Sequence, residues 1–454
     1  MVIKKYKLSD VAKVEISSVD KKTKDCETPV KLCNFTDVYH NWAITTEMAD
    51  NFMKATANAK EIEKFTIRKG QVAFTKDSET RDDIGIPTYI ADDFENVLLG
   101  YHCALITPDE SKISGKYLNA FMHSAYIQKY FELNATGSGM RYTLSLETLQ
   151  SMPLLIPSLK EQEAIGDLFS SIDRKIALNR SINQNLDALA KQLYDYWFVQ
   201  FDFPNEEGRP YKSSGGKMVW NDALKRHVPS IWSFKNLKDV ACFVKDKVET
   251  SKLNLNTYIS TENMQPNRGG ISIASNLPNT NYVTACNCGD IVIANIRPYF
   301  KKIFLIPTNG FGCSSDVLCI RANDPMYSRF VYGTLSDDAF FDYVMSGAKG
   351  SKMPRGDKEQ IMQYPVIVPN KELVEIFNCV VFPIHSQIHL YRKQAESLTK
   401  QRDELLPLLM NGQMSLNSDL SNRGVSGAYS GDTRSAIPVI PVHSVVDLQY
   451  RRQN

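Results

Sequence analysis

The sequence predicts an α+β fold: two tandem mixed α/β domains joined by two long helices that form an antiparallel coiled coil, with an internal pseudo-two-fold duplication. Three observations lead to this prediction: a repeat within the 454-residue chain, heptad patterns in both copies, and β-branched runs interspersed with amphipathic segments. Apolar residues make up 43% and charged residues 23%, which is typical of a folded globular chain and excludes disorder as the main state. The length fits two to four domains at roughly 150 residues each.

The repeat is clearest where SMPLLIPSLKEQEAIGDLFSSIDRKIALN (151–179) is compared with QYPVIVPNKELVEIFNCVVFPIHSQIHLY (363–391). A constant shift of 212 positions superposes the two Pro-x3-Pro segments and a run of Ile and Leu residues. Upstream, RKGQVAFTK (68–76) resembles NCGDIVIAN (287–295) at a shift of 219. The change of shift indicates loop insertions. Each copy is therefore a variable globular part followed by a less variable tail.

Both tails predict long helices with heptad repeats. The residues predicted to form the coiled coil, and so to set its length, are Ile165, Leu168, Ile172, Asn179, Ile182, Leu186, Leu189 and Leu193 in the first helix and Ile384, Leu398 and Leu405 in the second. Asn179 is either a device that fixes register or a tolerated defect. Pro383 is expected to kink or restart the second helix near residue 382. Two ordinary core helices are the alternative, but their equivalent places in a duplicated chain favour mutual pairing.

These patterns divide the chain into five segments. They are a first domain at 1–157, a central helix and connector at 158–227, a second domain at 228–369, a C-terminal helix at 370–414 and a poorly ordered tail at 415–454. The tail is assigned from its composition, which is rich in serine and glycine near its start.

No catalytic pattern accompanies this organisation. The sequence has no Walker A motif, no HExxH, no Asn/Asp-Pro-Pro-Tyr/Phe tetrapeptide of the amino-methyltransferases and no Gly-x-Gly-x-x-Gly after a strand. Cys286, Cys288, Cys313 and Cys319 could be imagined as zinc ligands, but their C-x-C…C-x5-C spacing is not a standard knuckle, and we expect no metal. Nine scattered cysteines indicate a reducing cytoplasm. Neither a secretory signal nor a membrane span is expected.

Basic and polar loops are the candidate functional features. An amphipathic segment precedes a glycine-containing loop in each copy, NATGSGMRY (134–142) and SGAKGSKMPRGDK (346–358), and the second copy adds NIRPYFKK (295–302). Glycine lets backbone N–H groups approach a phosphate, Lys and Arg neutralise it, and Arg can read guanine. The predicted DNA-binding residues are Ser138, Gly139, Arg141 and Tyr142 in the first copy and Arg297, Tyr299, Lys301, Lys349, Ser351, Lys352 and Arg355 in the second.

Solvated charged loops are the alternative interpretation, and a net charge of +2 excludes a uniformly polybasic protein. The matched places of the loops in the two copies favour nucleic-acid binding. Two such heads on one side of a duplex would contact half-sites about 34 Å apart and leave an unread spacer between them. Because the heads differ in sequence, the half-sites should differ too.

Residues 155–221, which include the aromatic run Tyr194–Phe203 and the following PNEEG, resemble the central conserved region of the specificity subunits of bacterial type I restriction-modification systems. VPSIW (228–232) is similar to the short Pro…Trp segment that opens a target-recognition domain in that family. The resemblance covers about 1–414. It departs from the family pattern in the second helix, where Pro383 stands at the place of Ser171.

The resemblance implies a non-catalytic chain of the bacterial cytoplasm whose two target-recognition domains each read one part of an asymmetric, bipartite double-stranded DNA sequence. It implies that the helices set the spacer and, with the central region, bind two methyltransferase subunits. Those partners use S-adenosylmethionine to methylate adenine N6 after base flipping. Restriction subunits add translocation and cleavage that need ATP and Mg²⁺. No cofactor is expected on this chain.

Two alternatives belong to other classes of protein. A coiled-coil scaffold that does not bind DNA would explain the helices but leave the matched basic loops without a role. A self-contained DNA methyltransferase or nuclease would need a cofactor pocket and catalytic residues that the sequence lacks.

Overall fold

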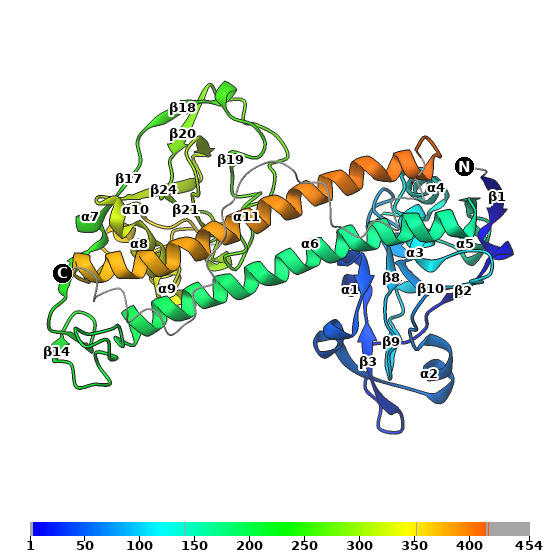
Figure 1. Cartoon of the computed structure of the whole chain (residues 1–454), viewed down its shortest axis with the longest axis horizontal. Helices are drawn as coiled ribbons and strands as arrows, with labels where there is room; N and C mark the ends of the chain where they lie inside the picture. The colour runs from blue at the N-terminus through cyan, green and yellow to red at the C-terminus, as the bar shows by residue number, and fades with distance from the viewer. Residues whose placement is uncertain (1–2, 140, 351, 415, 417–454) are drawn as a thin grey trace, which may run out of the picture. The chain divides into compact units, whose positions relative to one another are not determined.

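The computed structural model describes residues 3–139, 141–350, 352–414 and 416. They form two compact units: unit 1 contains 3–180 with 393–414 and 416, and unit 2 contains 181–392. Each unit combines a mixed α/β domain with part of each long helix, α6 (Leu159–Tyr194) and α11 (Lys371–Met410) (Figure 1). The predicted α+β class, with two mixed domains and two long helices, is confirmed.

Unit 1 is built on a five-stranded sheet of order β2–β10–β6–β8–β4. Its strands are β2 (Ala12–Ile16), β10 (Cys103–Pro108), β6 (Val72–Thr75), β8 (Pro87–Ile90) and β4 (Ala43–Ile44). Alternation along the central strands divides the core into two layers. Val72 and Phe74 pack with α3 (Gly115–Met122) and α4 (Ala125–Asn134), whereas Ala73 packs with α1 (Phe35–His40) on the other face.

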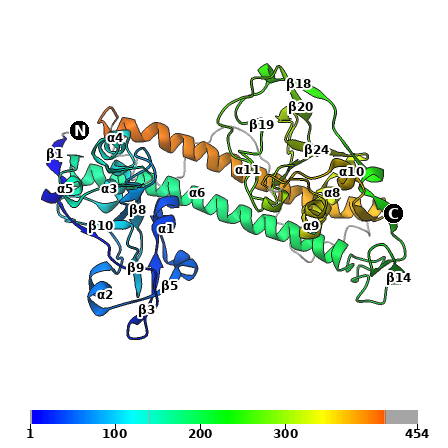
Figure 2. The ribbon, with the colours of Figure 1, turned by 180° about the vertical axis from the view of Figure 1, so that it is seen from behind.

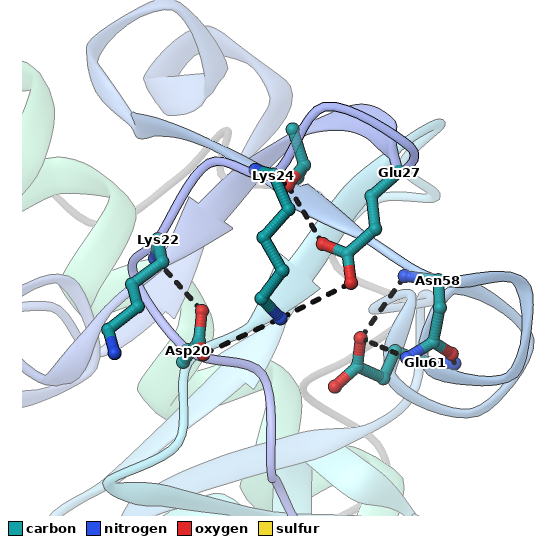
Figure 3. A network of polar contacts seen from close by, with 7 residues as sticks. Asp20, Lys22, Lys24, Glu27, Asn58 and Glu61 are labelled. Atoms are coloured by element: carbon teal, nitrogen blue, oxygen red, sulfur yellow. Dashed lines mark hydrogen bonds and ion pairs between the residues drawn. The ribbon is translucent and has the colours of Figure 1, made fainter.

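A second sheet in unit 1 has the order β5–β3–β9. Its strands are β3 (Thr28–Cys33), β5 (Met53–Ala57) and β9 (Val97–Leu99). At its tip Lys24 bridges Asp20 and Glu27, with Nζ–O distances of 3.7 and 3.2 Å (Figure 3). Asn58 begins α2 (Ala59–Phe65) and forms a capping box with Glu61. These exposed pairs order the connections on either side of the sheet and contribute little stability.

Unit 2 contains two four-stranded sheets, of order β17–β24–β21–β22 and β18–β20–β23–β19. Their strands are β17 (Ala241–Phe243), β24 (Val317–Ala322), β21 (Ile291–Ala294), β22 (Ile303–Leu305), β18 (Lys247–Glu249), β20 (Tyr282–Cys286), β23 (Phe311–Cys313) and β19 (Tyr258–Ile259). The helices of this domain are α7 (Leu237–Val240), α8 (Ser328–Leu335), α9 (Asp338–Ser346) and α10 (Lys358–Met362).

The duplication is visible in the strand pairing. In unit 1, β1 (Lys4–Lys7) pairs antiparallel with β13 (Pro153–Ile156), which follows the short helix α5 (Leu146–Gln150). In unit 2, β16 (Ser233–Asn236) pairs in the same way with β25 (Pro365–Val368), which follows α10. The antiparallel pair β6–β10 corresponds to the pair β21–β24. The weaker upstream match in the sequence therefore reflects a shared strand.

The connector between the first helix and the second domain packs onto unit 2. It carries a hairpin of β14 (Met218–Asn221) and β15 (Arg226–Pro229). Phe203 stacks on Trp232 with ring centroids 4.8 Å apart, and Phe198 meets Phe377 of α11 edge to face at 4.8 Å. These aromatic side chains anchor a segment whose Pro, Gly and Ser content would otherwise favour a loose linker.

The two long helices run antiparallel within each unit. Figures 1 and 2 show them side by side, and residues further along α6 contact residues that come earlier in α11. In unit 1, Asn179 bonds Gln394. In unit 2, Asp187 pairs with Arg392, and Trp197 packs on Phe377. The predicted antiparallel pairing is confirmed.

One of the two predicted heptad rows is displaced by one residue. The buried side chains of α6 are Gln162, Ile165, Phe169, Ile172, Ile176, Asn179, Asn183, Ala190 and Tyr194. The row of Ile165, Ile172 and Asn179 thus lies at the interface as predicted. Each buried residue of the second row comes four residues after a position of the first row, where the prediction had three. Leu168, Ile182 and Leu189 therefore lie beside the helix interface and not in it, and Leu189 is 49% exposed. Leu186 and Leu193 are half-buried.

The same displacement occurs in α11. Ile384, Leu398 and Leu405 are half-buried, and the neighbouring buried row contains Val381, Ile388 and Leu409. Both displacements have one cause: side chains three and four residues apart share a helix face, and apolar residues stand on both sides of the first row. Which of these two sides is buried depends on the structure that packs against the helix.

The expected restart of the helix at Pro383 is wrong, because α11 continues through that residue. Proline removes one backbone hydrogen bond and crowds the preceding turn, at a cost of about 3 kcal/mol. Val381 and Ile388 are buried on either side of it. Their burial holds the helix to the core, at roughly 1.5–3 kcal/mol for each large apolar side chain.

Candidate nucleic-acid interface

The predicted loop of unit 1 forms a hairpin beside the main sheet. Strands β11 (Thr136–Ser138) and β12 (Arg141–Thr143) pair with each other, and β12 also pairs with β7 (Asp77–Ser78), in register Tyr142↔Ser78 and Thr143↔Asp77. Gly139 has φ +75°, which suits the tight turn. The backbone of Ser138 belongs to β11. We call β7, β11 and β12, with Lys76, the basic edge of unit 1.

Asp77 is the centre of this edge. Its side chain is 9% exposed and contacts three cationic or ionisable groups. The distances are 2.8 Å to Lys76 Nζ, 2.7 Å to His102 Nδ1 and 3.3 Å to Arg141 Nη2. Burial pushes the pKa of Asp77 upward, but hydrogen bonds from His102, Lys76 and Thr143 outweigh it and lower the pKa to about 2. Asp77 is therefore ionised at neutral pH.

Aromatic side chains lie next to these charges. The Arg81 guanidinium sits over the Tyr142 ring, 5.1 Å from its centroid. The rings of Tyr101 and His102 are 3.8 Å apart, and Tyr101 is 37% exposed. The edge therefore offers cationic, hydrogen-bonding and stacking groups together, the mixture that DNA backbones and base edges engage.

In unit 2 the structure brings the two predicted basic loops together. The Arg297 amide donates to the Pro354 carbonyl at 2.8 Å, and β-bridges join Ile296 to Arg355 and Lys349 to Arg355. We call residues 295–302 and 349–355 the basic edge of unit 2. Ser351 lies outside the described residues.

The predicted residues of this edge differ in how far their charges are neutralised. Lys301 pairs with Asp338 at 2.9 Å, and Arg268 binds the same carboxylate. Those two cations lower the pKa of Asp338 to about 2. Lys349 pairs with Asp357 at 2.8 Å, and Arg355 pairs with Asp316 at 3.2 Å.

The other three described residues predicted for this edge, two cations and a tyrosine, differ from Lys301, Lys349 and Arg355 in forming no ion pair with a described residue. Arg297 and Lys352 are exposed, and neither makes an ion pair with another residue that the structure describes. Tyr299 is 46% exposed and packs on Phe300 with ring centroids 4.6 Å apart. Arg297 and Lys352 are thus the cations of this edge that are most available to a phosphate.

The two basic edges occupy equivalent places in the duplicated fold. The bridge Ile296↔Arg355 of unit 2 matches the pair Asp77↔Thr143 of unit 1 under the same shifts of 219 and 212 that relate the sequences. Sequence reasoning overlooked Lys76, Asp77 and His102. Extending the shift of 219 would have placed residues 76–83 opposite NIRPYFKK (295–302) and so directed attention to Lys76 and Asp77, whereas His102 lies outside that segment.

Three of the four cysteines considered for zinc come together, because Cys286, Cys313 and Cys319 lie in one buried cluster with their thiols hydrogen-bonded to one another. Cys286, Cys313 and Cys319 are buried, whereas Cys288 is exposed and its Sγ lies 3.3 Å from the Pro307 carbonyl. No group of three or more His, Cys, Asp or Glu side chains suited to a metal ion occurs in the part of the chain that the structure describes.

By length and composition, α11 could cross a membrane. Its apolar row, which includes Val374, Phe377 and Val381, is buried in the core of unit 2. One face of α11 is therefore buried, and a helix of this length and apolarity is by itself weak evidence for a membrane span.

Residues 3–188 match the family model described as "Type I restriction modification DNA specificity domain". The chain is 23% identical, over 446 residues, to the specificity subunit of the type I restriction enzyme HindI of Haemophilus influenzae, with 85% of this chain and 94% of that protein covered. Residues 3–188 thus match that domain, and most of the chain is similar to a specificity subunit.

Two further specificity subunits are similar to the chain. The specificity subunit of the type I restriction enzyme MjaIX of Methanocaldococcus jannaschii is 23% identical over 330 residues, covering 68% of this chain and 71% of its own length. The crystal structure of a type I restriction-modification S subunit from M. genitalium has the same fold, with a TM-score of 0.57 at 16% identity, covering 90% of this chain and 96% of that one.

Proposed function

We propose that this chain is the DNA sequence-specificity subunit of a type I restriction-modification complex and binds a bipartite, asymmetric double-stranded DNA target. The observation that carries the proposal is the recurrence of a basic edge at equivalent places in both units of a specificity-subunit fold. The edges differ in sequence: unit 1 presents Arg141, Tyr142 and His102, whereas unit 2 presents Arg297, Lys352 and Arg355. Each edge therefore reads a different half-site.

In this proposal α6 and α11 set the spacer, because paired helices have a fixed rise of about 1.5 Å per residue. The chain recruits two methyltransferase subunits and the restriction subunits, in the bacterial cytoplasm. S-adenosylmethionine, ATP and Mg²⁺ belong to those partners, and this chain performs no catalysis. Exposed apolar side chains near the connector support protein docking there: Tyr196, Val199, Val219, Trp220, Ile231 and Phe234 are each 37–56% exposed.

A methylome tests this function. The chain is expressed with the methyltransferase gene beside its own in a host without adenine methylation, and N6-methyladenine is mapped across the genome. We expect a split, asymmetric motif that disappears when this chain is omitted. If the two proteins form a complex and methylate no motif, or if the motif persists without this chain, the proposal fails.

A further inference from the structure

An arginine at each basic edge is held by a carboxylate of its own unit. Arg141 Nη2 lies 3.3 Å from Asp77 Oδ2, and Arg355 Nη2 lies 3.2 Å from Asp316 Oδ1. The two arginine side chains are 68% and 58% exposed despite these contacts. Each guanidinium is thus tethered at one nitrogen while most of it faces solvent.

The two carboxylates come from different places in the duplicated fold. Asp77 lies on β7, and the equivalent residue of unit 2 is Ile296. Asp316 precedes β24, and the equivalent residue of unit 1 is His102: the Lys76 amide donates to the His102 carbonyl, as the Asn295 amide does to Asp316. The carboxylate–arginine pair therefore recurs without being copied residue for residue.

Stability alone does not account for such pairs. An exposed ion pair contributes about 0–1 kcal/mol, and partial burial of Asp77 carries a desolvation cost. What the tether does is restrict the arginine rotamer. An arginine has five N–H donors, so a contact at one nitrogen leaves a pair of donors free for the O6 and N7 acceptors of a guanine in the major groove. Restricting the rotamer beforehand reduces the entropy lost on binding.

The surroundings of the pairs suit a base edge. In unit 2, Asp316 lines a hollow of about 280 Å³ whose wall is mostly polar, with Ser260, Asn263, Ser272 and Ser314 among its residues. In unit 1, His102 contacts the same carboxylate as Arg141 and lies against Tyr101. Hydrogen-bonding groups therefore lie beside each carboxylate that holds an arginine.

We propose that Asp77 and Asp316 are positioning residues that orient Arg141 and Arg355, each of which reads one guanine in its own half-site. Neither carboxylate touches DNA in this arrangement. The inference rests on the proposed function and deepens it, since it names one specificity-determining pair in each unit.

The test maps the methylated motif for Asp77→Asn and Asp316→Asn in the full complex with the methyltransferase. Asparagine keeps the size of the side chain and removes the charge that holds the arginine. We expect preference for guanine to fall roughly tenfold at one position of one half-site for each variant. The other half-site stays unchanged and serves as an internal control for folding. The double variant Asp77→Asn, Arg141→Ala should methylate the same motif as Arg141→Ala alone. Asp316→Glu, which keeps the negative charge, should keep the preference for guanine.

Matched controls are Asp167→Asn, whose carboxylate pairs with Lys116, and Asp324→Asn, whose carboxylate pairs with Lys371. Both should leave the motif intact. The inference is overturned if Asp77→Asn and Asp316→Asn keep the wild-type motif, or if the changes extend to both half-sites. If Asp77→Asn abolishes methylation altogether, Asp316→Asn decides, because its carboxylate is 40% exposed and can be replaced without opening the core. Absence of a split motif for the wild-type chain would refute the proposed function instead.

Discussion

Asn179 of α6 donates a side-chain hydrogen bond to Gln394 of α11, with Nδ2–Oε1 3.1 Å. Asn179 is 6% exposed and belongs to the same buried row as Ile165 and Ile172. A polar pair inside an apolar seam costs stability, but its partners meet in only one alignment of the helices. The pair therefore favours one register, and under the proposed function that register sets one spacer length.

Replacing Asn179 by leucine should stabilise the chain. Leucine fits an apolar seam, and Gln394 is exposed enough to bond water once its partner is gone. We expect the free energy of unfolding to rise by about 1 kcal/mol, measured by urea denaturation. The control is Leu178→Asn, at a neighbouring site that is 57% exposed, where a change below about 0.5 kcal/mol is expected. A lower stability for Asn179→Leu would show that the polar pair is itself stabilising.

Shortening both helices by one heptad should change the spacer. Residues 180–186 of α6 lie opposite 387–393 of α11, judged from the contacts of Asn179 with Gln394 and of Trp197 with Phe377. Removing both segments keeps the buried rows in phase and shortens the pair by about 10 Å, or roughly three base pairs. The methylome should show the same two half-sites with a shorter spacer. An altered half-site would contradict the spacer role, and a four-residue deletion, which breaks the phase, is the control.

Arg141→Ala should affect one half-site only. If Arg141 reads a base, discrimination at one position falls by about 1–3 kcal/mol, seen as methylation of a relaxed motif. The matched variant Arg81→Ala removes a neighbouring arginine that stacks on Tyr142, and we expect it to weaken methylation without changing the motif. Equal loss at all sequences for Arg141→Ala would instead assign that residue to a phosphate.

Lys352→Ala should weaken DNA binding uniformly and reduce the slope of log K against log salt by about 1. Lys352 is exposed and has no ion-pair partner among the described residues, so its charge is available to a phosphate. Lys349→Ala is the comparison, because Lys349 is already paired with Asp357 at 2.8 Å and its removal should change the slope less. Titrations of labelled target DNA at several salt concentrations measure both. Equal slopes for wild type and Lys352→Ala would exclude the contact.

Asp173 of α6 should make unit 1 less stable as pH rises. Burial raises the pKa of Asp173 from 3.8 to about 6, although Arg402 and Arg180 act in the opposite direction. The folded chain therefore holds this proton more tightly than the unfolded chain, and stability is lost as pH rises from about 4 to about 6.

Asp173→Asn should accordingly be more stable than wild type by about 1–2 kcal/mol at pH 8 and equally stable near pH 4. Thermal denaturation across that pH range measures the difference. Asp167→Asn, at a carboxylate on the same helix whose side chain is 64% exposed, should follow the wild-type profile. A stability difference between Asp173→Asn and wild type that does not vary with pH would show that Asp173 is not protonated in the folded state.

Heptad periodicity predicted the packing of the two long helices only in part. Heptad spacing placed one row of α6 correctly because Ile165, Ile172 and Asn179 recur every seven residues. It misplaced the second row because Leu168 and Phe169 are both apolar and both adjoin the first row. The chemistry of proline likewise predicts a break in the helix at Pro383. The burial of side chains on either side of Pro383 keeps α11 continuous.

The candidate site, too, could be predicted from the sequence only in part. Glycine and basic residues identified the loops that contain Arg141, Arg297 and Arg355, since composition is a local signal. Repeat spacing could have pointed to the segment that contains Asp77. The contacts of Asp77 and Asp316 with arginines could not be predicted, because they depend on strands that meet only in the fold. Asp77, for example, is 64 residues from Arg141 in sequence.

Periodicity, repeat spacing and composition were enough to predict the duplication, the two long helices, the mixed α/β domains and the basic loops. Three features became known only from the tertiary structure. They are the side of each helix that is buried, the contact between residues 295–302 and 349–355, and the contacts of Asp77 and Asp316 with arginines. The reason is physical: local patterns restrict what each segment can become, whereas the choice among nearly equal faces and partners is made by the packing of segments that are distant in sequence.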